Sequence, residues 1–201
     1  NLLSLVKDEH IADLVEKMNK ASNIFCFAMG RSGYILRCLS MRLMHLRYAV
    51  HFVGETITPK IRSGDLLIVL SGSGETGLTH HVTVLAKKEG ATTYGVVGSL
   101  DSRIARDVDH VLCLPGGSKT HFPGEVPSVQ PAGSLFEQAA FLFFEAIHIY
   151  PLSIIRDLFG KGRAFTGAST LILVYAIFYC TRKIIGLRFL NLKNHVESPE
   201  G

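Results

Sequence analysis

The sequence predicts an α/β fold, a three-layer αβα sandwich around a five-stranded parallel sheet of the flavodoxin-like kind. Two patterns indicate it. Short apolar runs alternate along the chain with segments whose apolar residues recur at helical spacing, and this alternation is typical of βαβ units. The runs are apolar at almost every position, as expected for strands covered by helices on both faces. With 201 residues, the chain is long enough for one domain with a full-sized core.

The expected elements follow one another in a regular order. The chain opens with a surface helix over residues 2–20, whose apolar residues form one stripe. Five apolar runs are expected as strands, at residues 23–28, 49–53, 66–70, 92–97 and 110–114. Helices are expected over 33–47, over about 76–88, briefly between the last two strands, and from Ser134, which is placed as an N-cap.

Composition narrows the class of protein. Apolar residues make up 47% of the chain and charged residues 19%, so it is globular rather than disordered. A net charge of +4 without a run of Lys and Arg suits a small anionic ligand and gives no support for nucleic acid as a partner. The cysteines lie far apart and form no C-x-x-C pair, which favours reduced thiols over a disulfide frame or a zinc site: Cys26, Cys38, Cys113 and Cys180.

The second half of the chain holds a long loop and an unusual tail. Residues 115–133 are rich in Pro, Gly and Ser, and a loop of this length is more often functional than idle. Residues 1–150 are expected to form the domain and 151–201 an atypical tail. Residues 164–180 carry no charge and suit a buried segment better than a membrane span, for which they are short. Because the N-terminus is acidic and amphipathic rather than a signal peptide, a cytoplasmic protein is expected.

Two turns at the ends of predicted strands share one design. Gly30-Arg31-Ser32-Gly33 follows the first strand, and Ser71-Gly72-Ser73-Gly74-Glu75-Thr76 follows the third. Glycines bring backbone N–H groups close to an anion, and a helix N-terminus adds its positive dipole end. Neither turn fits a P-loop or G-x-G-x-x-G, so a monophosphate is favoured over a nucleotide. The alternative is that Ser71 and Ser73 only cap the following helix.

Four motifs in this order resemble one family. They are GRSGYILRCLSMRLMHL (30–46), VGETITP (53–59), DLLIVLSGSGET (65–76) and QPAGSLFE (130–137). Together they resemble the 3-hexulose-6-phosphate isomerases of the sugar isomerase (SIS) domain superfamily, with dense similarity over about residues 20–150. The resemblance implies interconversion of D-arabino-3-hexulose 6-phosphate and fructose 6-phosphate, as in the ribulose monophosphate pathway. It also implies a homotetramer and no metal or organic cofactor.

Such a reaction needs one base near the substrate carbons. The proton on C2 must leave, a cis-enediol forms, and a proton returns to C3, so a single carboxylate suffices if other groups polarise the carbonyl oxygen. Glu137 is the candidate for the base, because it lies on the first turn of its helix just past the Gly/Pro loop. The alternative is a solvated first-turn glutamate that the helix dipole favours.

Other candidates carry both a functional and a structural interpretation. His45 is a candidate for proton transfer between oxygens, or a histidine favoured at a helix end. Glu55 is expected to bind sugar hydroxyls or to organise its own turn. Arg31 is expected to contact the sugar or phosphate, or to pair with an acid at a subunit contact. His80 and His81 are interpreted as surface or interface residues.

The tail departs from the family. Members close with a segment like R-H-x-N-L, whose His completes a neighbouring site, and here Asn194-His195-Val196-Glu197 resembles it only faintly. His195 is therefore the weakest catalytic candidate, and the tail is an adapted C-terminus, an anchor or a translated non-coding sequence. Two rival functions stay open: another phosphosugar isomerase, such as one for arabinose 5-phosphate, and a non-catalytic phosphosugar sensor.

Overall fold

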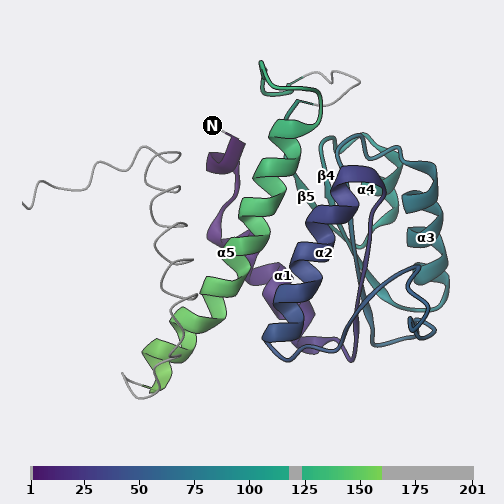
Figure 1. Cartoon of the computed structure of the whole chain (residues 1–201), viewed down its shortest axis with the longest axis vertical. Coiled ribbons are helices and arrows are strands. Elements are labelled where there is room, and N and C mark those ends of the chain that lie inside the picture. Colours follow the sequence, from purple (N-terminus) through teal and green to yellow (C-terminus); the bar gives the residue numbers. More distant parts are fainter. Residues whose placement is uncertain (1, 118–123, 160–201) are drawn as a thin grey trace, which may run out of the picture. The chain divides into compact units, whose positions relative to one another are not determined.

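A computed structural model describes residues 2–117 and 124–159 (Figure 1). Its elements are η1 (Leu2–Leu5), α1 (Asp8–Lys20), β1 (Ile24–Phe27), α2 (Gly30–His45), β2 (Val50–Phe52), β3 (Leu66–Ser71), α3 (Gly77–Lys88), β4 (Thr92–Val97), α4 (Arg103–Asp107), β5 (His110–Cys113) and α5 (Ser134–Phe159). All five predicted strands are present, and the predicted α/β fold class is confirmed.

The strands form one parallel sheet in the order β2-β1-β3-β4-β5. From the central pair β1 and β3, the chain builds outward in one direction to β2 and in the other to β4 and β5. In doubly wound sheets, the point where the strand order reverses is where ligands bind. Here Phe27 of β1 lies in register with Val69 of β3, so the turns that follow these two strands leave the sheet side by side.

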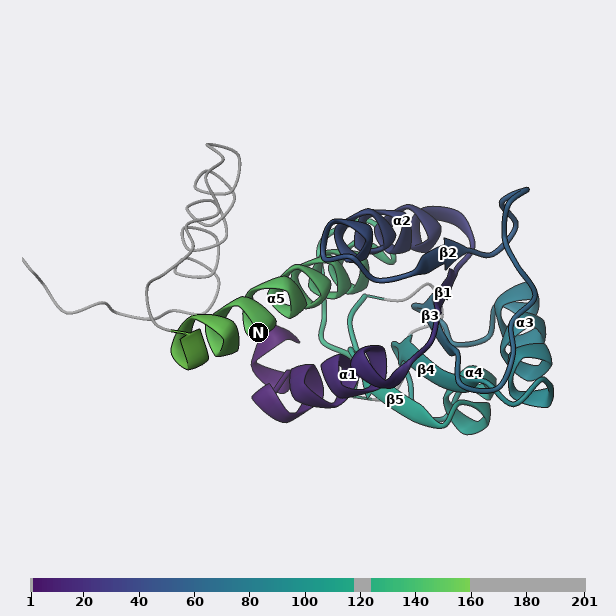
Figure 2. The same cartoon turned by 90° about the horizontal axis from the view of Figure 1, so that it is seen from below.

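The side chains of the sheet alternate between two apolar clusters. Cys26 and Ile68 belong to the cluster that α1, α2 and α5 cover, whereas Phe25, Leu67 and Val69 belong to the cluster that α3 and α4 cover. Figure 2 shows these two layers on opposite sides of the strands. Every residue of β3 is buried. This agrees with the continuous apolar run in the sequence, which predicted a strand covered on both faces.

Two expected helices begin elsewhere than predicted. The helix expected over 2–20 is broken into η1 and α1, because Lys7 is extended and its N–H donates to Nδ1 of His10, 3.1 Å away, which starts α1 at Asp8. The helix expected from residue 33 begins at Gly30. The segment Gly30-Arg31-Ser32-Gly33 is therefore the first turn of α2 and not a loop before it.

The last helix differs from expectation in its N-cap residue. The N–H of Glu137 donates to the carbonyl of Gly133, which has a φ of +89°, so Gly133 takes the cap position assigned to Ser134. Helix α5 runs on to Phe159, and the domain boundary expected at residue 150 falls inside it. Cys180 and the apolar segment 164–180 lie outside the described residues. No helix within residues 2–117 and 124–159 is long and apolar enough to cross a membrane.

A largely buried ion pair joins α2 to α5. Nε of Arg42 lies 3.3 Å from Oε1 of Glu145, and Nη2 lies 3.4 Å from Oε2. The Glu145 side chain is 7% exposed and that of Arg42 is 26% exposed. A buried carboxylate left without its partner is strongly destabilising, so this pair fixes how α5 lies against α2.

We expect Arg42→Ala to lower the free energy of unfolding by about 2–3 kcal/mol, below the full value for a buried pair because Arg42 is partly exposed. Lys20→Ala is the matched control, since it removes a cation from the exposed pair with Glu16, and its effect should stay under about 0.5 kcal/mol. Urea unfolding of both variants measures the difference. Equal losses would mean that the Arg42–Glu145 pair carries no special role in α5 packing.

Candidate active site at the β1 and β3 ends

The loop after β3 is closed by its own hydroxyl groups. The Ser71 Oγ accepts the N–H of Gly74 at 3.1 Å and lies 3.0 Å from Oγ1 of Thr76. The Ser73 Oγ accepts the N–H of Glu75 at 3.1 Å. The hydroxyls of Ser71 and Ser73 therefore bond within the loop, in contrast to the alternative that they cap α3. Thr76 holds the N-cap position and its side chain makes no cap bond, which leaves the first-turn N–H groups of α3 available to a ligand.

Two glycines are required by close approaches to this loop. A Cβ on Gly98 would lie 2.2 Å from the carbonyl oxygen of Gly72. Gly74 has a φ of +66°, and a Cβ there would lie 2.0 Å from Oγ of Ser102. The end of β4 and the start of α4 thus support the loop directly, and any larger residue at these positions would displace it.

The first turn of α2 lies against the end of β1. A Cβ on Gly33 would come within 2.8 Å of the carbonyl oxygen of Ala28, so glycine allows the helix to start immediately after the strand. Ser32 is half-buried. The side chain of Arg31 is 67% exposed, and its Nε lies 2.7 Å from Oε2 of Glu137.

The first turn of α5 connects these two segments. Glu137 pairs with Arg31, and its side chain is only 12% exposed. Phe136, one residue earlier, is buried, and its ring carbon Cδ1 lies 3.1 Å from the position that a Cβ of Gly72 would take. The structure therefore brings together the α2 first turn, the loop 71–76 and the α5 first turn. The carboxylate of Glu137 is partly shielded from water and has one cationic partner.

Glu55 lies at the same end of the sheet but has its own partner. It follows β2 and forms an ion pair with Arg37 of α2, whose guanidinium carbon lies 3.9 Å from the centre of the Phe52 ring. Its backbone N–H donates to the carbonyl of Phe52, and its carbonyl accepts the N–H of Thr58. Glu55 thus organises its turn, and its exposed carboxylate stays close to α2.

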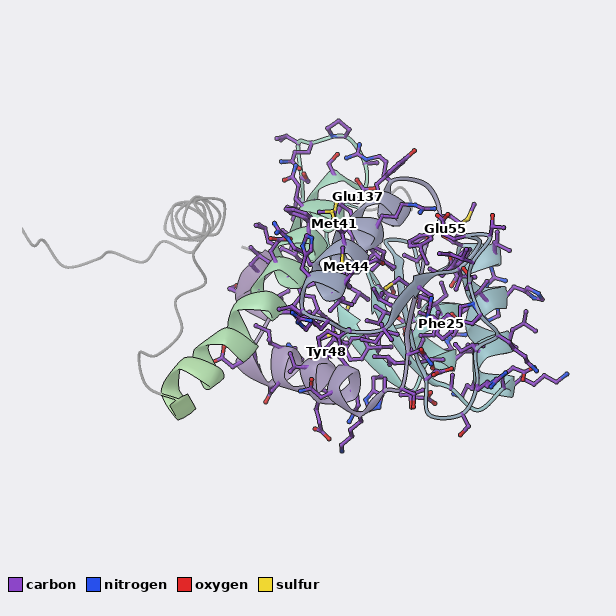
Figure 3. The ribbon with its side chains drawn as sticks, turned by 60° about the horizontal axis from the view of Figure 1, so that its bottom comes forward. Phe25, Met41, Met44, Tyr48, Glu55 and Glu137 are labelled. Atoms are coloured by element: carbon purple, nitrogen blue, oxygen red, sulfur yellow. The ribbon has the colours of Figure 1, made fainter. Side chains whose placement is uncertain are left out.

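The structure does not bring His45 to these residues within one chain. His45 is the exposed last residue of α2, about 22 Å along the helix from Gly30. Figure 3 shows the same separation: Glu137 lies near one end of α2 and Tyr48 near the other, with Met41 and Met44 between them. His80 pairs with Asp107 of α4 at 2.5 Å, away from the loop hydroxyls, and His195 lies outside the described residues.

Three contributors to the site were missed by sequence reasoning. Phe136 supports the loop, although it stands inside the motif QPAGSLFE. Ser102 and Arg103 hold the loop from α4, where nothing in the local sequence signals a role. Arg31 was expected either to contact the sugar or phosphate or to pair with an acid at a subunit contact, and sequence reasoning did not identify its partner in the same chain, Glu137.

We expect Gly98→Ala to lower the free energy of unfolding by about 2 kcal/mol, because its methyl group must push backbone rather than a side chain. Gly77→Ala is the matched control: no atom lies within 4 Å of its Cβ position at the start of α3, so stability should be unchanged or slightly higher. Thermal and urea unfolding of the two variants make the comparison. A Gly98→Ala protein as stable as the Gly77→Ala protein would contradict the close approach.

Comparison with known proteins places the chain in a family. The SIS domain model matches residues 17–141. The 3-hexulose-6-phosphate isomerase of Bacillus subtilis is 36% identical over 151 residues, covering 73% of this chain and 80% of that protein. The enzyme of the same name from Mycobacterium gastri is 40% identical over 158 residues, covering 73% and 79%.

A solved structure agrees with these relatives. It is that of a Methanococcus jannaschii protein for which a molecular function of 3-hexulose-6-phosphate isomerase was inferred. The two chains are 29% identical with a TM-score of 0.68, and the match covers 83% of this chain and 96% of that one. The resemblance predicted from the four motifs is thereby confirmed, and the chain belongs to the SIS-domain family.

Proposed function

We propose that the chain is an isomerase that interconverts D-arabino-3-hexulose 6-phosphate and fructose 6-phosphate through an enediol. One observation carries the proposal: the partly shielded carboxylate of Glu137 directly follows Phe136, whose ring packs against Gly72 of the hydroxyl-lined loop at the β1–β3 end of the sheet. The similarity to enzymes named 3-hexulose-6-phosphate isomerase supports the same substrate.

The loop 71–76 is proposed to hold the phosphate. Its hydroxyls bond to one another and to loop N–H groups, and they can turn to donate to phosphate oxygens. The N-termini of α2 and α3 add N–H groups and a positive dipole at the same end of the sheet. This cradle contains no lysine, so it suits a single phosphate group better than a chain of them.

Glu137 is proposed to move the proton. Its carboxylate takes the proton from C2 of the 3-ketose, the C2–H electron pair forms the C2=C3 double bond of the enediol, and the C3 oxygen is protonated. Return of the proton to C3, with loss of the hydroxyl proton at C2, gives the 2-ketose. Arg31 orients the carboxylate, and its guanidinium group, 67% exposed, is proposed to polarise the carbonyl oxygen when substrate binds. The reaction is a net proton shift, so it requires no electron carrier.

We expect Glu137→Gln to abolish isomerisation while leaving fructose 6-phosphate binding within about tenfold, or 1.4 kcal/mol, of the unchanged protein. The amide keeps the shape of the side chain but cannot accept the C2 proton. A coupled assay for fructose 6-phosphate and calorimetric binding measure the two effects. Glu9→Gln is the matched control, a first-turn glutamate of α1 that pairs with Lys7.

Turnover by the Glu137→Gln protein at the original rate would exclude Glu137 as the base. If the unchanged protein binds fructose 6-phosphate and never isomerises the hexulose phosphate, the sensor function replaces the enzyme. Isomerisation of arabinose 5-phosphate, without activity on the hexulose phosphate, would mean that the chain is an arabinose 5-phosphate isomerase.

The proposal includes a homo-oligomer, with a tetramer as the expected assembly, in the cytoplasm. Along α2, four residues spaced at three to four positions share one exposed face that no other described element covers: Tyr34, Cys38, Met41 and His45. Tyr34 is 72% exposed and Met41 is 52% exposed. A second copy of the chain is the proposed occupant of this face, and in that arrangement His45 reaches another subunit and not its own site.

We expect Met41→Glu to lower the mass measured by light scattering, because two carboxylates would be buried at a self-complementary contact. Leu85→Glu on α3 is the control, since Leu85 is similarly exposed at 46% but lies on the opposite layer. An unchanged mass for Met41→Glu, or an equal decrease for Leu85→Glu, would contradict the proposal that α2 forms the subunit interface.

A further inference from the structure

Helix α4 is attached to the loop 71–76 by several bonds that the proposed chemistry does not use. The Arg103 N–H donates to Oε1 of Glu75 at 2.8 Å, and its Nε donates to Oε2 at 2.6 Å. Nη2 of the same guanidinium donates to the backbone carbonyl of Glu75 at 2.8 Å. The N–H of Ile104 donates to the carbonyl of Gly74 at 3.1 Å. The start of α4 therefore bonds both to the Glu75 side chain and to the main chain of the loop.

This attachment is unusual for a pair on the protein surface. The side chains of Arg103 and Glu75 are 53% and 44% exposed, and isolated pairs at such exposure contribute little to stability. Here a single arginine satisfies a carboxylate and a loop carbonyl at once. Because Glu75 also donates its N–H to Ser73, holding Glu75 in place holds the Ser73 hydroxyl as well.

We propose that Glu75 and Arg103 are positioning residues that preorganise the loop 71–76 for the phosphate group of the substrate. The proposal rests on the proposed phosphosugar function and extends it to a pair of residues that touch neither the phosphate nor the reacting carbons. A loop with glycines at positions 72 and 74 has much conformational freedom. Ordering such a loop on binding reduces the ligand affinity, unless the folded protein already holds the loop in the bound conformation.

The pair also solves an electrostatic problem. The carboxylate of Glu75 would repel a phosphate bound to this loop. The guanidinium of Arg103 offsets its negative charge by pairing with it directly. The backbone and side-chain hydrogen bonds from Arg103, with the nearby charge of Arg106, hold the pKa of Glu75 below its usual value. Since that pKa is lowered in the folded protein, the pair is intact at neutral pH and is lost only as the pH falls through the lowered pKa.

The expected kinetic signature separates this role from that of Glu137. Loss of an interaction that serves substrate and transition state equally raises KM and leaves kcat unchanged. We therefore expect Arg103→Gln to raise KM for the sugar phosphate about tenfold, with kcat within about threefold of the unchanged enzyme. Arg103→Lys keeps the charge but cannot make all three contacts, so its KM should lie between those of the unchanged enzyme and of Arg103→Gln. The affinity for inorganic phosphate, measured by calorimetry, should fall in parallel with the rise in KM.

Glu89→Gln is the matched control. It breaks the Lys60–Glu89 pair, which has a 2.7 Å contact and a glutamate 40% exposed, at the other end of α3. Its KM and phosphate affinity should not change. Thermal unfolding verifies that each variant is folded, and where Arg103→Gln is not, Arg103→Lys carries the comparison.

The outcomes distinguish this proposal from the proposed function. If Arg103→Gln folds and keeps the original KM and phosphate affinity, or loses only kcat, the positioning role is wrong. If the unchanged protein binds phosphate without isomerising the sugar, and Arg103→Gln weakens that binding, the positioning role holds and the isomerase does not. Failure of the unchanged protein to bind phosphate at all would overturn both.

Discussion

The parallel pairing of β1 with β3 is the constraint on which the site depends. The two strands are neighbours in the sheet, but the helices that follow them cover opposite faces: α2 packs in one apolar cluster and α3 against the other. The turns after β1 and β3 therefore leave the same end of the sheet towards opposite faces, and at that end an anion can meet two helix N-termini. The glycines at positions 33, 74 and 98 suit this geometry, because each allows an approach of backbone or side chain that a Cβ would block.

Helix α5 brings its first turn against the loop after β3, and two arginine–glutamate pairs join this helix to α2. Arg31 and Arg42 stand eleven positions apart, three helical turns, and each pairs with a glutamate of α5. The two pairs differ in burial. Arg42 is mostly buried and its pair orients the helices, whereas Arg31 is mostly exposed and holds the carboxylate of Glu137. The Arg42–Glu145 pair thus serves helix packing, whereas the Arg31–Glu137 pair belongs to the candidate site.

The sequence was informative where the physical signal is local. The five strands, the position of the hydroxyl-rich loop after β3 and the first-turn position of Glu137 in α5 could be predicted because apolar runs, glycines and first-turn acids are visible within a few residues. The pairing of Arg31 with Glu137 joins residues far apart in the chain, and that of Glu75 with Arg103 joins a loop residue to the first residue of α4, so no periodicity reveals either. The break at Lys7 involves a hydrogen bond from the Lys7 N–H to the side chain of His10, which a helical period does not reveal. His45 was grouped with the site by its motif, but the rise of an α-helix carries it to the other end of α2, so a catalytic role for His45 stays a prediction.

The same reasoning explains why the motif SGSGET is not by itself a site. Its glycines let the backbone turn towards an anion, and for that reason the loop would be poorly ordered if nothing else held it. Order is supplied from three other elements: the end of β4 at Gly98, the start of α4 at Ser102 and Arg103, and the first turn of α5 at Phe136. Because Phe136 precedes Glu137 directly, the residue that supports the loop 71–76 also sets the position of the proposed base. A movement of this loop would therefore be transmitted to the carboxylate through one buried ring.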